Sequence, residues 1–78
     1  MRYSIKINDD VCSRQAANLV FRLSDLKGYV YIIKDNRMIN AKSIIGVLSL
    51  GLKKDDVVEI SCKEDIYKID EIFKEVIG

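Results

Sequence analysis

Ser43 stands directly before a short apolar run, Ile44-Ile45-Gly46-Val47-Leu48-Ser49-Leu50, which has helical spacing and stops at Gly51. A serine at the start of a helix accepts a hydrogen bond from a backbone amide, worth about 1 kcal/mol. A phosphate on the same hydroxyl would add about −1.5 to −2 charge beside helix amides, which favour anions. Ser43 is therefore expected to begin this helix, and it is also a candidate regulatory phosphorylation site.

Cys12 is the second residue whose type and position could do chemistry. It precedes a predicted helix and lies close in sequence to Arg14, and both features lower the pKa of a thiol and favour thiolate. The acidic pair Asp9-Asp10 opposes that shift. Two interpretations stay open: a small residue without reactivity, or a reactive or redox-sensing thiol.

Metal and cofactor chemistry finds little support in the composition. The chain has two cysteines, Cys12 and Cys62, no Cys-x-x-Cys pair and no histidine, so a structural zinc site would lack ligands. Cys62 ends a predicted strand and is expected to be a small buried apolar residue. We expect no metal and no cofactor.

Length and charge exclude several classes of function. The 78 residues are expected to form a single domain, 1–78, with a thin core. Thirteen basic and 12 acidic residues give a net charge of +1, which argues against nucleic acid as the main partner. No apolar run approaches the roughly 20 residues that span a bilayer, and the N-terminus lacks a signal-peptide apolar region. The sequence thus predicts a cytoplasmic protein without membrane insertion.

The elements that must position these residues follow the order βαββαβα, an α+β pattern. The ranges are strand 3–7, helix 13 to about 26 ended by Gly28, strands 29–34 and 37–40 around an Asp35-Asn36 turn, helix 43–50, strand 57–62, and a final helix capped by Asp65. Helices that are apolar on one side must cover one sheet face. We expect an open-faced β-sandwich, a four-stranded antiparallel sheet covered on one face by three helices. Without its last helix the order also describes ferredoxin-like small-ligand modules.

Two segments resemble one known family, the HPr phosphocarriers of bacterial sugar phosphotransferase systems. The segment from Asn40 to Gly51 closely resembles the family's regulatory-serine segment. The stretch Asp10-Val11-Cys12-Ser13-Arg14-Gln15-Ala16 corresponds to the family motif Gly-Leu-His-x-Arg-Pro-Ala. Arg14 and Ala16 match, whereas Asp10, Cys12 and Gln15 replace the glycine, the phosphorylated histidine and the proline.

The resemblance implies roles for particular residues. It implies an HPr-like fold, regulatory phosphorylation at Ser43, and a partner-binding surface that includes Arg14 and the aliphatic residues Ile44, Ile45 and Leu48. Packing into the core is the alternative for those three aliphatic residues. Cys12 would occupy the phosphohistidine position, where a phosphothioester is chemically feasible but poorly aligned for donors built around imidazole. Histidine phosphocarrier activity is ruled out, and we do not expect an enzyme.

The departures in the histidine motif favour one function over two alternatives. Three changes within seven residues resemble the regulatory, catabolite-repression members of the family, which lack the histidine but keep the serine. We therefore expect a regulatory or adaptor protein whose partners are phosphotransferase-system enzymes, a serine kinase or a transcriptional regulator. The alternatives are a degenerate phosphoryl carrier that uses Cys12 and a ferredoxin-like small-ligand sensor, which would require a pocket.

Overall fold

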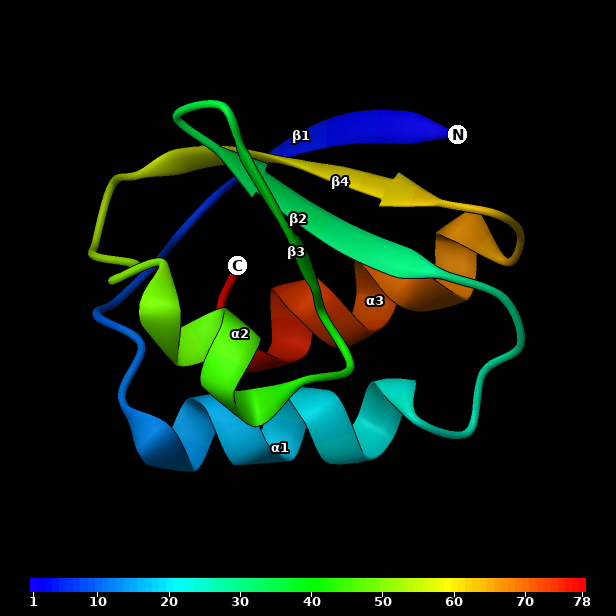
Figure 1. Ribbon diagram of the computed structural model, residues 1–78, viewed down its shortest axis with the longest axis horizontal. Helices are drawn as coiled ribbons and strands as arrows, with labels where there is room; N and C mark the ends of the chain where they lie inside the picture. The colour runs from blue at the N-terminus through cyan, green and yellow to red at the C-terminus, as the bar shows by residue number, and fades with distance from the viewer.

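A computed structural model describes all of residues 1–78 and shows a sheet with helices on one side (Figure 1). The elements are β1 Arg2–Lys6, α1 Ser13–Leu23, β2 Val30–Lys34, β3 Arg37–Asn40, α2 Ile44–Ser49, β4 Val57–Cys62 and α3 Ile66–Val76. The sheet is antiparallel throughout, in the order β1-β4-β2-β3. All three helices lie below it in Figure 1, which confirms the expected open-faced sandwich.

The core fills the space between the sheet and the helices. It comprises 19 buried apolar residues, contributed by every strand except β3, by all three helices and by the loops between them. The apolar stripes read from the sequence supply most of it, and Cys62 is fully buried as expected. None of the helices is long and apolar enough to cross a membrane.

The turn between β2 and β3 follows from its two residues. Asp35 and Asn36 both adopt positive φ, 49° and 67°, the conformation that a two-residue hairpin with the twist of the flanking strands requires. The strands pair in register across it, with Lys34 opposite Arg37 and Tyr31 opposite Asn40. This turn was predicted from the sequence and is confirmed.

The end of α1 was predicted wrongly. The helix stops at Leu23 rather than near Leu26, and its C-cap is Ser24. The Ser24 hydroxyl donates to the carbonyl oxygen of Phe21 at 2.7 Å, a local bond that competes with continuation of the helix. Gly28 does have positive φ, 80°, but it lies in the following loop, where an added Cβ would meet Lys63 at 3.0 Å.

The start of α3 departs from expectation as well. Asp65 occupies the N-cap position, but its backbone is left-handed, with φ 58° and ψ 39°. A capping side chain normally needs an extended backbone to reach the first amides, and the Asp65 side chain makes no capping hydrogen bond. The helix instead begins through the Asp65 carbonyl, which accepts from the Ile69 amide at 3.0 Å.

Candidate functional site at the α1–α2 face

Ser43 is the N-cap of α2, as predicted. Its backbone is extended, with φ −115° and ψ 119°, and its hydroxyl accepts from the Gly46 amide at 3.1 Å. A Cβ on Gly46 would lie 3.3 Å from both the Ser43 hydroxyl and the Asn40 carbonyl, closer than ordinary contact. The absence of a Cβ at Gly46 therefore leaves room for the Ser43 hydroxyl to reach the Gly46 amide.

The aliphatic residues of α2 divide into a buried and an exposed set. Val47 is fully buried and Leu50 nearly so, whereas Ile44, Ile45 and Leu48 are 42, 82 and 38 % exposed. A six-residue helix has room for only one or two side chains in the core, so the rest face solvent. The structure places the three predicted partner-binding residues of this helix on the surface, and the core alternative for them is wrong.

Both ends of α2 are held by side chains from neighbouring segments. Arg37 donates to the Ser49 carbonyl at 2.9 Å and to the Ser49 hydroxyl at 3.1 Å, and Gly51 ends the helix with φ 59°. Before the helix, the Lys42 ammonium donates to the carbonyl of Gly28 at 2.9 Å. These contacts anchor the helix at both ends, so its exposed residues have a defined position relative to the sheet.

Arg14 and Cys12 lie at the start of α1, the helix that packs against α2. Both are exposed, and the Arg14 guanidinium makes no hydrogen bond or ion pair within the protein. No hydrogen bond links either residue to α2. We call the surface formed by Arg14, Ser43, Ile44, Ile45 and Leu48 the α1–α2 face.

Gln15, which stands where the family motif has a proline, contacts Cys12. Its side-chain oxygen accepts from the Cys12 amide at 3.2 Å and from the Cys12 thiol. The backbone N–H groups of Arg14 and then Gln15 hold the pKa of the thiol below its ordinary value, with a smaller contribution from the Arg14 charge. The hydrogen bond to Gln15 favours the protonated thiol, because only the protonated form can donate. It therefore opposes the backbone N–H groups, which favour the thiolate.

The acidic pair before Cys12 does not act as predicted. Neither Asp9 nor Asp10 contributes to the shift of the Cys12 pKa. The Asp10 carboxylate accepts from the Lys54 amide at 2.9 Å, and Asp9 accepts from the Asp10 amide at 2.8 Å. Both cysteines are free thiols, and no cluster of three or more His, Cys, Asp or Glu side chains could hold a metal ion.

The comparisons with known proteins agree with this fold. The sequence matches the family model described as the PTS HPr component phosphorylation site over residues 2–71. The chain belongs to the HPr family. A search of curated proteins gave no significant match.

Solved HPr structures share the fold of this family member. HPr-C-His from Thermoanaerobacter tengcongensis superposes with a TM-score of 0.84 at 29 % identity, covering 96 % of this chain and 92 % of that one. The histidine-containing phosphocarrier protein of a mycoplasma gives 0.86 at 22 % identity, with 100 and 99 % covered, which shows the fold alone. Bacillus subtilis Crh, described as a catabolite repression protein in an intertwined, swapped dimer, gives 0.67 at 25 % identity, with 92 and 78 % covered.

Proposed function

We propose that this HPr-family chain is a regulatory or adaptor protein that docks partner proteins through its α1–α2 face. The observation that supports this most directly is the exposure of Ile44, Ile45 and Leu48 on a helix that follows Ser43 immediately. Clustered exposed aliphatic side chains are typical of interaction surfaces. The partners we propose are phosphotransferase-system enzymes, a serine kinase or a transcriptional regulator.

The chain's composition supports a regulatory role over a carrier role. It contains no histidine, and in the proposed alignment Cys12 stands in the family's phosphohistidine position. The Cys12 thiol is engaged by Gln15. A phosphate donor built around imidazole would meet a shorter side chain in a different direction, and a small misplacement can cost about 100-fold in rate.

Phosphorylation of Ser43 would change docking through charge. The half-buried hydroxyl lies at the first turn of α2, so a phosphate would place about −1.5 to −2 charge beside Ile44. An apolar partner surface would have to desolvate that charge, and an acidic partner facing Arg14 would be repelled. A basic partner would bind more tightly.

Modification of Ser43 is tested by incubating the chain and a Ser43→Ala variant with ATP and an HPr-type serine kinase. Intact-mass spectrometry should show one added phosphoryl group on the parent chain and none on the variant. A parent chain that stays unmodified while a histidine-containing HPr control is phosphorylated would contradict the serine switch.

The effect on docking is tested with Ser43→Asp, using Ser43→Ala as the uncharged control. Calorimetry against candidate partners should show a changed affinity for the aspartate variant only, weaker for apolar or acidic partners and stronger for basic ones. Equal affinities for parent and aspartate variant with every partner would mean that Ser43 is a cap and nothing more.

The cysteine-carrier alternative has its own test. Enzyme I and phosphoenolpyruvate should add negligible phosphate to this chain, measured by intact mass, under conditions in which an HPr control is fully phosphorylated. Rapid phosphate gain that disappears in Cys12→Ala would overturn the regulatory interpretation in favour of the carrier.

A further inference from the structure

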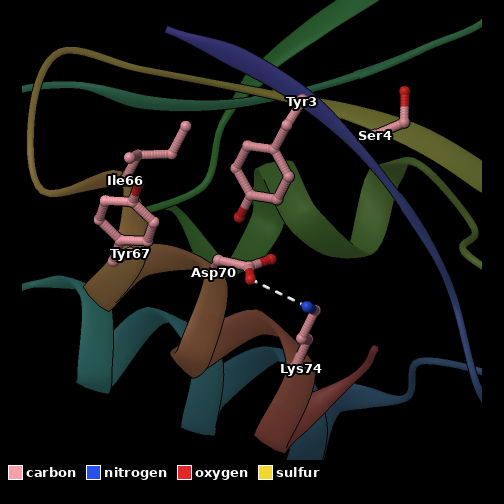
Figure 2. Close-up of a pocket in the computed structure, with 6 residues that line it drawn as sticks. All are labelled: Tyr3, Ser4, Ile66, Tyr67, Asp70 and Lys74. Atoms are coloured by element: carbon pink, nitrogen blue, oxygen red, sulfur yellow. Dashed lines mark ion pairs between the residues drawn. The ribbon is translucent and has the colours of Figure 1, made fainter.

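A pocket of about 290 Å³ lies between the edge strand β1 and helix α3, built from elements that contribute nothing to the α1–α2 face (Figure 2). Its volume is close to the lower limit of about 300 Å³ that is typical of small-molecule sites. The residues that line it are Tyr3, Ser4, Ile66, Tyr67, Asp70 and Lys74. They combine two aromatic rings, one carboxylate and one ammonium group in a small space.

Tyr3 brings a buried polar group into the pocket that the protein satisfies only weakly. It lies on the sheet face that Ile5 also occupies, so its ring points toward the helices. Its hydroxyl is almost completely shielded from solvent, makes no well-aligned hydrogen bond, and has only a weak interaction of this kind with the Asp70 carboxylate. Burial first, and then the negative charge of Asp70, raise the pKa of this hydroxyl well above its ordinary value.

Figure 2 shows the Tyr3 hydroxyl directed toward the Asp70 carboxylate, which is also paired with Lys74. The Asp70–Lys74 distance is 3.0 Å, and the two residues are four apart on α3. The aspartate side chain is 29 % exposed and the lysine side chain 64 % exposed. The anion is thus held inside the pocket, whereas the cation reaches it from solvent on a flexible stem and can be exchanged.

Apolar surface surrounds this charge pair at the rim. Tyr67 is 89 % exposed, and Ile66 is half-buried against the core. An exposed aromatic ring beside a carboxylate is suited to a ligand that joins a cationic group to an apolar body.

We propose that the β1–α3 pocket binds a free amino acid with an aromatic or aliphatic side chain. The ligand's ammonium group replaces the Lys74 ammonium at Asp70, while the buried Tyr3 hydroxyl faces the same carboxylate from the inner side of the pocket. Lys74 then turns to the ligand's carboxylate, and the ligand side chain lies along Tyr67 and Ile66. The exchange leaves every charge paired, which an amine or a carboxylic acid alone would not do.

The test compares three probes by an amide-resolved NMR titration of the full chain. L-Phenylalanine should cause saturable shifts concentrated at Ser4, Tyr67, Asp70 and Lys74. Phenethylamine, which lacks the carboxylate, should bind at least fivefold more weakly, and 3-phenylpropionate, which lacks the amine, should cause no saturable shift. Absence of saturable shifts with L-phenylalanine, or equal binding of all three probes, would overturn the proposal.

Matched variants locate the binding groups. Asp70→Asn should weaken L-phenylalanine binding at least tenfold, and Tyr3→Phe, which keeps the ring, should weaken it several-fold. Tyr29→Phe and Asp25→Asn alter exposed residues that do not line this pocket, and both should bind like the parent chain. Unchanged affinity in Asp70→Asn would contradict the site. Because none of these changes touches Ser43 or α2, the result is independent of the proposed docking function.

Discussion

Helices α2 and α3 are both rich in isoleucine, yet they use it in opposite ways. In α3, Ile69, Ile72 and Phe73 are buried beneath the sheet. In α2 the only buried residue is Val47, while Ile44 and Ile45 face solvent. The difference lies in length, since 11 residues present a repeated stripe to the sheet and six cannot. Apolar content alone therefore does not distinguish a residue that holds the fold from one that is free to bind.

Truncating one large apolar residue in each helix tests the difference most directly. Phe73→Ala should lower the free energy of unfolding by about 3–5 kcal/mol, because the ring is fully buried and its removal leaves a cavity. Ile45→Ala should change it by less than about 0.5 kcal/mol, as exposed substitutions usually do. Urea denaturation of both variants measures these changes. Similar losses in the free energy of unfolding would contradict the assignment of Phe73 to the core and Ile45 to the surface.

A finer comparison stays within α2. Val47→Ala should lower the free energy of unfolding by about 1.5 kcal/mol or more, from roughly 0.8 kcal/mol per buried methylene. The adjacent Leu48→Ala should cost less in stability and more in partner binding, although leucine loses more atoms. Denaturation and calorimetry on the same samples decide this, and a loss of several kcal/mol for Leu48→Ala would place that residue in the core.

The smallest effect concerns the cap of α2. Ser43→Ala removes the acceptor for the Gly46 amide and should lower the free energy of unfolding by about 1 kcal/mol. Ser43→Asp should restore most of that loss, since a carboxylate caps equally well and is favoured by the helix dipole. Thermal denaturation at low salt measures the difference. An aspartate variant less stable than the alanine variant would show that the site cannot accommodate negative charge.

Much of the architecture could be predicted from local signals. The seven elements, the Asp35-Asn36 turn and the Ser43 cap all depend on neighbouring residues, and all are confirmed. The errors arose at two helix ends, where a side-chain hydrogen bond or an unusual backbone conformation overrode the apolar pattern. Ser24 ended α1 early through its own hydroxyl, and the left-handed backbone of Asp65 kept a good capping residue from capping.

The candidate sites were predictable only in part. The resemblance to the HPr family implied that Ile44, Ile45 and Leu48 would lie at the surface, and they are exposed. The β1–α3 pocket was missed, because it depends on bringing Tyr3 beside Asp70 from opposite ends of the chain. The contact between Gln15 and Cys12 could have been found, since a residue three positions after the N-cap often reaches back to it.

The strand order has a consequence for how the chain folds. β2 and β3 pair across a two-residue turn, whereas β1 pairs with β4, with Arg2 opposite Ser61. Local hairpins close in microseconds, but a pairing across most of the chain must first overcome the entropy of closing a long loop. We expect the hairpin to be formed in the folding transition state and β1 to dock late. In stopped-flow experiments, Ile39→Val should then slow folding, whereas Ile5→Val should mainly accelerate unfolding.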